Sequence, residues 1–380
     1  MNESSRPKNE TPGNGSRHAI EQTDETATVL TGSGPILQPF DPLAARPELW
    51  SRYHAFRRQR HAERDPDEPL DTDETVEGRM RIESKTWLAR RVFVEEDGRM
   101  VGFTELEGPK PGSPEYPTNR HLVYASLGVV GPYRRRGLGT ALLRRALAEL
   151  DERGARVLTC WTSEPDGHEF AARVGFQPKQ VERISRLAFD AVDWAMIDRW
   201  IADLERRAPG TRLELYPVRV PDDFLATYCP ARTKLMNLMP WDDADHGDIV
   251  VTPDDFRELA KRLDVSRTEH HTAITREPDD TISGITDVAW SPENPHEVEQ
   301  WFTGVDPAYR GRGLGKALKA VMLRFCRERY ADLRYIRTGN SVTNGSMLAI
   351  NDRLGFQETR RFTTYQIERD ALAAHLSGRR

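Results

Sequence analysis

The stretch DPAYRGRGLGKALKAV, residues 306–321, sets three glycines and two arginines in front of an amphipathic helix pattern. A nearly identical phrase, GPYRRRGLGTALLRRA, occupies residues 131–146. A glycine-rich turn at the start of a helix is a phosphate-binding layout, because the first helical amides and the helix dipole favour an anion and glycine admits a close approach. Each stretch therefore predicts a site for a ligand that carries phosphate.

The two commonest phosphate-binding patterns do not fit this turn. A Walker loop needs a glycine five residues before its Gly-Lys pair, and that position here is Arg310. A dinucleotide-binding turn needs a third glycine where this chain has Leu318. The pattern that remains is Arg-x-x-Gly-x-Gly, formed by Arg310, Gly313 and Gly315 and, in the upstream copy, by Arg134, Gly137 and Gly139.

The two turns belong to a tandem repeat of one domain. Gly313 follows Gly137 by 176 residues, and the Gly-Phe pair at 355–356 follows the pair at 175–176 by 180 residues. Two separate sequence features that recur after nearly the same number of residues indicate an internal repeat. We expect an N-terminal domain over residues 35–190, a helical connector over residues 191–210 and a C-terminal domain over residues 211–380.

Around each turn the apolar pattern predicts a similar succession of strands and helices. Strands are expected at residues 36–40, 86–97, 100–108, 121–130 and 155–163, and again at 212–218, 270–277, 282–290, 297–305 and 333–341. Helices are expected at residues 47–64, 72–83, 169–176, 221–233, 252–263, 314–327 and 344–356, and after the first turn, where Leu138, Leu142, Ala146 and Leu150 share a stripe.

Composition narrows the function classes. The net charge of −5 and the pI near 6.1 argue against a general nucleic-acid-binding protein, which is usually strongly basic. The three cysteines stand far apart without metal-ligand spacing, which favours a reducing cytoplasm and predicts no metal site. No stretch is apolar enough for a signal peptide or a membrane span. Residues 1–34 are polar and predict a disordered tail.

The Arg-x-x-Gly-x-Gly turn resembles the acyl-CoA pyrophosphate loop of the GNAT N-acetyltransferase superfamily. A strand ends at Val305 just before it, and NGSMLAINDRLGF, residues 344–356, looks like the family's Asn-containing helix that closes on Gly-Phe. Because the loop and helix pattern recurs in the same order, the chain resembles a tandem two-domain member. The resemblance implies an α/β (α+β) fold of two tandem GNAT domains, each a mixed, mostly antiparallel twisted sheet flanked by helices.

The resemblance also implies acetyl-CoA as the acyl donor. The amides of Thr303 and Val305 are expected to pair with its pantetheine arm, and Asn344 either caps the next helix or hydrogen-bonds the arm. The residues implied in binding are Thr303, Val305, Arg310, Gly311, Arg312, Gly313, Leu314, Gly315, Lys316 and Asn344 in the C-terminal domain, and Val129, Arg134, Arg135, Arg136, Gly137, Leu138, Gly139 and Thr140 in the N-terminal domain.

Acetyl transfer to an amine requires a base, because an alkyl amine with a pKa of about 10 arrives protonated. We expect Glu299 to be this base and Glu297 to be the second choice, since members of the family carry a catalytic glutamate on the matching strand. A charge that points into water is the competing interpretation of Glu299. The aligned loops place Val123 and His121 opposite these glutamates, so we expect the C-terminal domain to carry the chemistry. The N-terminal domain would bind CoA unproductively or serve as a scaffold.

One part of the family's mechanism lacks its usual residue. Many members place a tyrosine, the acid that protonates the leaving thiolate, four residues before the glycine of Gly-Phe. The matching residues here are Asn351 and Ala171, neither of which can donate a proton usefully. Water, the substrate ammonium or another side chain must then supply the proton.

The segment over residues 232–248 follows the first strand of the second domain and by resemblance lines the acceptor site. Trp241, Asp242 and Asp243 would suit a cationic or amino-sugar acceptor, although a solvated acidic loop explains them equally well. The expected function is N-acetylation of a small-molecule primary amine by direct attack. Transfer to a protein or peptide amine and a catalytically silent CoA sensor are the alternatives, and neither nucleic acid nor membrane is expected as a partner.

Overall fold

The structure, a computed structural model, describes residues 35–378, so the tail predicted over residues 1–34 lies outside the described residues. The first half contains β1 (Leu37–Pro39), α1 (Pro47–Arg64), α2 (Asp73–Met80), β2 (Trp87–Glu96), β3 (Arg99–Pro109), α3 (Tyr116–Asn119), β4 (Leu122–Val129), η1 (Gly131–Tyr133), α4 (Leu138–Arg153), β5 (Val157–Thr162), α5 (Pro165–Val174) and β6 (Gln177–Ala188).

A 3₁₀ turn, η2 (Phe189–Ala191), and the helix α6 (Trp194–Arg207) connect the halves. The second half contains β7 (Arg212–Tyr216), η3 (Asp222–Phe224), α7 (Leu225–Met236), α8 (Pro253–Val265), β8 (Glu269–Arg276), β9 (Ile282–Trp290), β10 (Glu297–Val305), η4 (Pro307–Tyr309), α9 (Leu314–Arg329), β11 (Tyr335–Ser341), α10 (Gly345–Leu354), β12 (Gln357–Glu368) and α11 (Arg369–Ser377).

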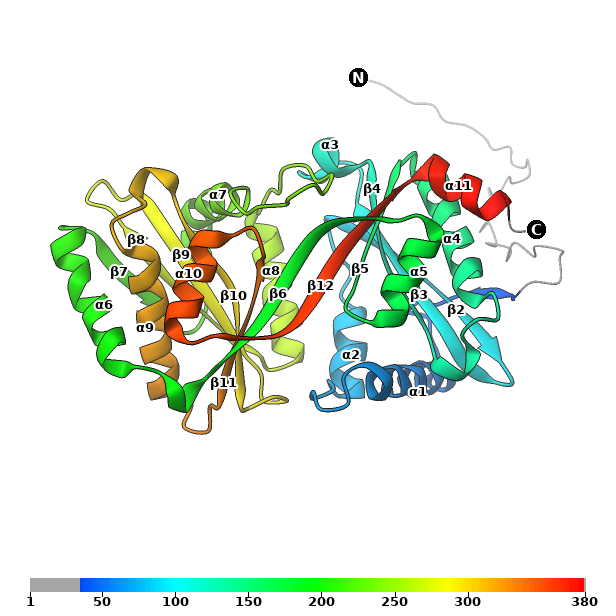
Figure 1. The fold of residues 1–380 in the computed structure, drawn as a ribbon, viewed down its shortest axis with the longest axis horizontal. Helices are drawn as coiled ribbons and strands as arrows, with labels where there is room; N and C mark the ends of the chain where they lie inside the picture. Colours follow the sequence, from blue (N-terminus) through cyan, green and yellow to red (C-terminus); the bar gives the residue numbers. More distant parts are fainter. Residues whose placement is uncertain (1–34, 379–380) are drawn as a thin grey trace, which may run out of the picture. The chain divides into compact units, whose positions relative to one another are not determined.

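Within the described residues, twelve strands form one sheet in the order β1-β2-β3-β4-β5-β12-β6-β11-β10-β9-β8-β7 (Figure 1). All neighbouring strands are antiparallel except two pairs, β4 with β5 and β10 with β11. The mixed, mostly antiparallel sheet expected from the sequence is therefore confirmed.

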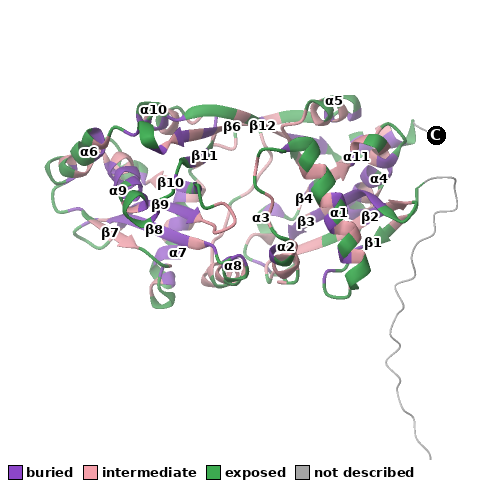
Figure 2. Cartoon of the chain, turned by 90° about the horizontal axis from the view of Figure 1, so that it is seen from below, coloured by how far each residue is buried: buried purple, intermediate pink, exposed green. Residues whose placement is uncertain are grey.

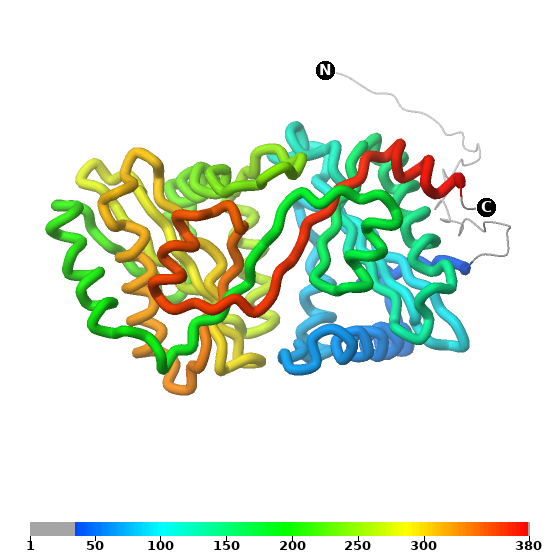
Figure 3. Tube along the Cα trace, in the orientation of Figure 1, coloured from blue at the N-terminus to red at the C-terminus, as the bar shows by residue number. Residues whose placement is uncertain are grey.

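The strand that follows each Gly-Phe pair crosses into the other half. β6 pairs with β11 over Tyr335–Ser341, and β12 pairs with β5 over Val157–Thr162. The two crossing strands also pair with each other, and they run side by side through the middle of the chain trace (Figure 3). Each half of the sheet is thus completed by a strand from the other, and the domain boundaries drawn from the sequence stay a prediction.

Helices cover both faces of the sheet in each half, and the buried residues gather between helices and strands (Figure 2). In the first half, α4 packs Leu143 and Leu150 against Leu158, while α1 packs Trp50 and Phe56 on the opposite face. In the second half, α6 and α9 share one core cluster, and α7 belongs to another. Among the described residues, no helix is long and apolar enough to cross a membrane, and no group of three His, Cys, Asp or Glu residues could hold a metal ion.

A β-bulge in β10 changes which residues of the two halves correspond to each other. The pairing of β9 with β10 shifts register between Gln300 and Phe302, whereas β3 pairs with β4 without a shift. The carbonyl of His296 accepts two backbone amides just before β11, as the carbonyl of His121 does just before β5. The residues that match Glu297 and Glu299 are therefore Leu122 and Tyr124, and the expected matches His121 and Val123 are wrong.

Candidate functional site

The two glycine-rich turns have the same backbone conformation. Gly137 and Gly313 precede α4 and α9 with φ values of +84° and +87°, a left-handed conformation that glycine adopts without strain. Neither helix has a side-chain cap at its N-terminus, and the amides of Ala141 and Ala317 bond back to the two glycines. The amides of the preceding helical residues have no partner inside the helix, so they remain available to an anion.

The arginine of each turn is fixed to the strand before it. Nε of Arg134 donates to the carbonyl of Val129 at 3.1 Å, and Nε of Arg310 donates to the carbonyl of Val305 at 3.2 Å. This shared contact leaves the outer nitrogens of both guanidinium groups to other partners, which at Arg134 are the carboxylates of Asp166 and Glu63. The Arg-x-x-Gly-x-Gly pattern therefore has one structure in both halves.

A cavity of about 710 Å³ opens beside the N-terminal turn. β4 pairs with β5 only over Leu122–Tyr124, so the two strands part beyond Tyr124 and residues from Ala125 to Val129 line the opening. The cavity extends to α1 and α5. Six of the residues predicted to bind the ligand line it, namely Val129, Arg134, Arg135, Gly137, Gly139 and Thr140.

The remaining two predicted residues of this turn lie elsewhere. The guanidinium of Arg136 stacks over the ring of Tyr133, with 5.0 Å between its carbon and the ring centre. The side chain of Leu138 is buried in the core next to α1. At Leu138 only the backbone amide can face a ligand.

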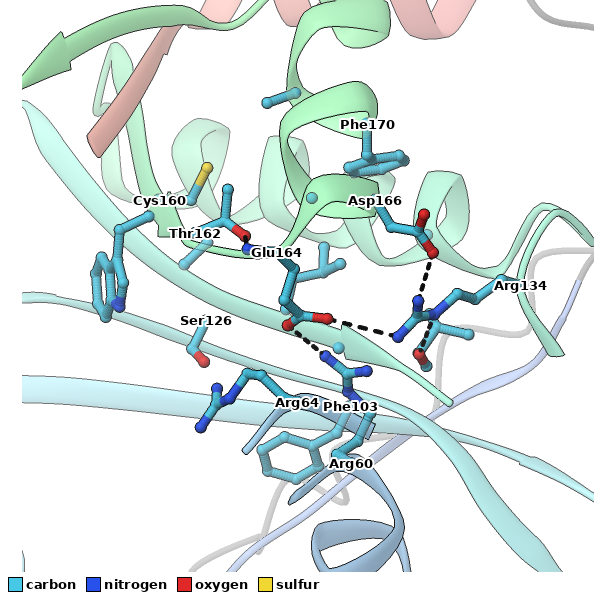
Figure 4. Close-up of a pocket in the computed structure, with 18 of the residues that line it drawn as sticks. Arg60, Arg64, Phe103, Ser126, Arg134, Cys160, Thr162, Glu164, Asp166 and Phe170 are labelled. Atoms are coloured by element: carbon cyan, nitrogen blue, oxygen red, sulfur yellow. Dashed lines mark hydrogen bonds and ion pairs between the residues drawn. The ribbon is translucent and has the colours of Figure 1, made fainter. Parts of the chain in front are cut away.

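Charged side chains meet at the mouth of the cavity, where Glu164 lies between Arg60 and Arg134 (Figure 4). Arg60 donates to Glu164 at 2.7 Å, and Arg134 pairs with Asp166 at 2.5 Å and with Glu63 at 3.2 Å. Burial raises the pKa of Glu63, but hydrogen bonds from the amide of Gly131 and from Arg60 outweigh it, and the net pKa is lowered. Arg134 thus already holds carboxylates where an anionic ligand would approach.

Two carboxyl groups lie on β3, and one of them borders the same cavity. Glu105 lines the cavity and forms a double hydrogen bond with Arg91 at 3.0 and 2.9 Å. Glu107 is two residues further along the strand, and burial together with the charge of Glu105 raises its pKa to about 7. A carboxyl group with a pKa near neutrality can exchange a proton readily at physiological pH.

In the C-terminal half, β10 and β11 also part early. They pair only from Glu297 to Gln300, and Glu299 stands within this short paired stretch. The Glu299 side chain is 49% exposed; it accepts a hydrogen bond from Nε1 of Trp301 at 3.1 Å and one from Arg337 at 3.3 Å. The predicted base therefore faces solvent at the edge of the strand opening.

Glu297, the second choice, is held in an ion pair. Its side chain is 3% exposed and lies 2.5 Å from Nε of Arg186 on β6. Burial raises the pKa of Glu297, and the nearby Arg186 lowers it, with a raised pKa as the net result. Because Arg186 comes from the crossing strand, this contact connects the two halves.

Three asparagines lie on β11 and α10 and at the start of α10, and one of them, Asn344, was predicted to contact the thioester arm. Asn344 caps α10, because its side chain accepts a hydrogen bond from the amide of Met347 at 3.3 Å. Asn351 donates to Oδ1 of Asn340 at 2.6 Å. Oδ1 of Asn351 is buried and has no hydrogen-bond partner among residues 35–378. This acceptor suits a ligand that offers an N–H group.

The other predicted residues of the C-terminal turn have mixed surroundings. Arg312 pairs with Glu277 at 2.9 Å and also donates to Thr211, so its side chain has a structural role. The carbonyl of Gly311 accepts a hydrogen bond from Arg207 of α6 at 2.8 Å. Nζ of Lys316 lies 5.5 Å from the centre of the Trp200 ring. The connector α6 therefore borders the C-terminal turn.

Three more predicted residues of the C-terminal half have surroundings that limit what they can offer a ligand, namely Thr303, Leu314 and Gly315. The side chain of Leu314 is buried in the core, so it can offer only its amide. A Cβ at Gly315 would lie 3.5 Å from Ile350 and 3.6 Å from Val305, so helix α10 and β10 approach the turn closely at this glycine. Oγ1 of Thr303 lies 2.8 Å from Oγ1 of Thr286.

The segment predicted to line the acceptor site bridges the two halves. Trp241 stacks on His246 with ring centres 3.9 Å apart, and Asp242 accepts hydrogen bonds from Ser341 and Thr343 just before α10. The amide of Asp243 donates to the carbonyl of Lys179 on β6. These contacts give the segment a structural role, and its contact with an acceptor stays a prediction.

The sequence reasoning missed the cavity residues that come from α1, above all Arg60 and Arg64. They precede the turn by about seventy residues, and their run of positive charge looks like any solvated helix face. It also missed the buried Lys319 on α9, which lies at an apolar position of the helix. A lysine at an apolar position of a helix is itself a sequence signal, because lysine is rarely buried without a partner.

Comparison with known proteins gives the family. The model of the acetyltransferase (GNAT) family matches residues 48–176 and 235–356, each of which contains one glycine-rich turn. The chain is 28% identical over 257 residues to mycothiol acetyltransferase from Nocardia farcinica, which covers 63% of this chain and 71% of that protein. Mycothiol acetyltransferase from Acidothermus cellulolyticus is 26% identical over 283 residues, covering 69% and 74%.

Solved structures share the fold. A tandem GNAT protein from the clavulanic acid biosynthesis pathway matches with a TM-score of 0.68 and 20% identity, over 88% of this chain and 98% of that one. A GCN5-related N-acetyltransferase from Sphaerobacter thermophilus matches with a TM-score of 0.58 and 15% identity, over 88% and 95%. The twofold family match and the tandem neighbour agree with the repeat found in the sequence. The chain belongs to the acetyltransferase (GNAT) family as a tandem member, an N-acetyltransferase that uses acetyl-CoA as its acyl donor.

Proposed function

We propose that the protein transfers the acetyl group to a primary amine of a small molecule, that the amine attacks directly, and that the reaction takes place in the C-terminal half. The observation that carries this proposal is Glu299, a half-exposed carboxylate on β10 at the point where β10 and β11 part. A small-molecule acceptor is in keeping with the two relatives, which are named mycothiol acetyltransferases.

The residues of the C-terminal half fit acetyl-CoA. The uncapped amides at the start of α9 and the outer nitrogens of Arg310 would hold the diphosphate. The unpaired Oδ1 of Asn351 would accept a hydrogen bond from an amide N–H of the pantetheine arm. When it is bound, acetyl-CoA supplies the reactive thioester. Glu299 takes the proton that the attacking amine must lose.

The N-terminal cavity fits a second acetyl-CoA that does not react. It has the volume, the turn and the parted strands, but Tyr124 stands where the other half has Glu299. Burial raises the pKa of Tyr124, so its hydroxyl keeps its proton at neutral pH and cannot serve as a base. We infer that the N-terminal half binds acetyl-CoA and stabilises the shared sheet.

A second candidate places the reaction in the N-terminal half. The pair formed by Glu105 and Glu107 favours it, because Glu107 has a pKa of about 7 and Glu105 lines the cavity. In this arrangement the carboxyl pair would take the proton of the amine. The two candidates use different bases, so substitutions separate them.

The test is a thiol-release assay with acetyl-CoA and a panel of small primary amines, carried out on the wild type, Glu299→Gln and Glu107→Gln. We expect Glu299→Gln to lower kcat by about 10²- to 10⁴-fold, the usual contribution of a general base. A loss caused by Glu107→Gln alone would move the reaction to the N-terminal half. Binding of CoA without thiol release from any amine would contradict the enzymatic proposal and favour a CoA sensor.

A further inference from the structure

Lys319 on α9 is a buried lysine without an acidic partner. The residue is 2% exposed, and its Nζ donates a hydrogen bond to Oε1 of Gln300 at 2.6 Å. The ring centre of Phe356 lies 5.6 Å from the same nitrogen. Lysine is almost never fully buried unless it is paired, because its charge is costly to remove from water. This position therefore needs an explanation beyond packing.

The repeat shows where Lys319 lies relative to the ligand. Its counterpart on α4, five residues after the first helical residue in both helices, is Leu143, which lines the N-terminal cavity. Phe356 has Phe176 as its counterpart, and Phe176 lines that cavity as well. By the same geometry, Lys319 and Phe356 face the region of the C-terminal half that the thioester arm would enter.

A hydrogen-bond chain connects Lys319 to the strand opening. Nε2 of Gln300 donates to Thr286 at 2.8 Å and to Thr303 at 3.2 Å, and Thr303 is a residue predicted to contact the arm. The position at which many family members place an acidic tyrosine is Asn351, whose amide cannot protonate a thiolate. The site thus has a base in Glu299, and among residues 35–378 the proton donor that this hydrogen-bond chain connects to the opening is Lys319.

We propose that Lys319 is the catalytic acid of the C-terminal half and protonates the sulfur of CoA as it leaves. The bond between the amine nitrogen and the acetyl carbon forms, the carbon–sulfur bond breaks, and its electron pair stays on sulfur. The ammonium of Lys319 gives its proton to that sulfur, while Glu299 takes the proton lost by the amine. Lys319 then regains a proton from solvent. This inference rests on the proposed reaction in the C-terminal half.

The surroundings of Lys319 suit such a donor. The groups that face Nζ are neutral: Gln300 on β10, with Thr286 and Thr303 behind it, and the ring of Phe356. Burial lowers the pKa of Lys319 to about 7. A lysine that is partly protonated at neutral pH can both give up and regain a proton within one turnover.

The first test is the pH dependence of kcat. In the wild type, kcat should fall as the pH rises above about 7, because the neutral amine of Lys319 has no proton to give. Lys319→Met should lower kcat by about 10²- to 10⁴-fold and abolish the fall at high pH. Met322→Leu, a buried change one turn further along α9, is the control for altered packing and should keep both the rate and the profile.

The second test does not depend on turnover. The ultraviolet absorbance of the thiolate is followed during a pH titration of free CoA bound to each protein, with desulfo-CoA as the blank. Because Lys319 is charged only below about pH 7, the wild type should hold more thiolate than Lys319→Met at pH 6 to 7, and the two titrations should converge at higher pH. Equal titrations of the two proteins would overturn the inference.

These outcomes separate this inference from the proposed function. If the wild type acetylates an amine and its kcat does not fall at high pH, Lys319 is not the acid, although the proposed function stands. If Glu299→Gln has full activity in the thiol-release assay, the proposed reaction in the C-terminal half is contradicted. An acetyl group found on Lys319 by mass measurement would also overturn the inference, because it would make Lys319 an acceptor. The wild-type profile decides the question even if Lys319→Met does not fold.

Discussion

Replacing Lys319 with methionine should change how the stability of the protein depends on pH. Burial lowers the pKa of Lys319 from its ordinary value of 10.5 to about 7 in the folded protein. The unfolded chain then binds this proton more tightly than the folded protein, so the free energy of unfolding rises with pH between these two pKa values. From pH 6 to pH 9 the linkage amounts to about 2.5 kcal/mol.

Methionine has a similar length and no charge, so it removes this pH dependence. It also leaves Oε1 of Gln300 without its donor, which costs about 1–3 kcal/mol at every pH. The variant should therefore gain stability relative to the wild type at pH 6 and lose that advantage by pH 9. The difference in unfolding free energy between the two proteins should change by about 2.5 kcal/mol over this range.

Urea unfolding followed by circular dichroism at pH 6, 7, 8 and 9 measures this difference directly. Groups other than Lys319 titrate in both proteins, so their contributions cancel in the comparison. Met322→Leu serves as the packing control, and its difference from the wild type should not vary with pH. A difference between Lys319→Met and the wild type that stays constant from pH 6 to pH 9 would refute the reasoning.

Three further outcomes are expected. Gly313→Ala forces a side chain into a left-handed conformation with its Cβ 3.2 Å from Arg207. It should lower the free energy of unfolding by about 1–2 kcal/mol, measured by thermal unfolding, and weaken CoA binding. Gly345→Ala, with open space around it, is the control and should change neither. Arg186→Met leaves Glu297 buried without its partner and should cost about 2 kcal/mol in urea unfolding; a loss below about 0.5 kcal/mol would speak against the contact between the halves. Deletion of residues 357–380 removes the strand that pairs with β5, so the β5 amides should lose their protection in hydrogen exchange, and retained protection would contradict the strand crossing.

The sequence predicted the repeat, the turns and most of the elements because these depend on local chemistry. Gly137 and Gly313 are needed for a left-handed residue before each helix, and the stripe that contains Leu142 and Leu150 is buried as expected. Each feature is decided by neighbours within a few residues along the chain. Patterns of this kind are visible in one sequence without any knowledge of tertiary contacts.

The features that the sequence did not reveal depend on contacts between distant segments. β6 and β12 carry many charged residues and were not assigned as strands, although they form the junction between the halves. The bulge adds one residue to β10, and no local sequence pattern indicates it. Because of this residue, the counterpart of Glu299 is Tyr124 and not the expected Val123. The cavity needs Arg60 from α1 beside a turn far along the chain. Such pairings follow from the packing of the whole sheet.

The central claim is that the C-terminal turn holds the acetyl-CoA that reacts. It is tested most directly by the rate of thiol release, with one acceptor amine, in Arg310→Glu and in Arg134→Glu, which reverse the charge at the matching arginine of each turn. The account predicts that Arg310→Glu raises the KM for acetyl-CoA and loses most of the rate at low acetyl-CoA concentration. A full rate with Arg310→Glu, together with a lost rate in Arg134→Glu, would contradict it.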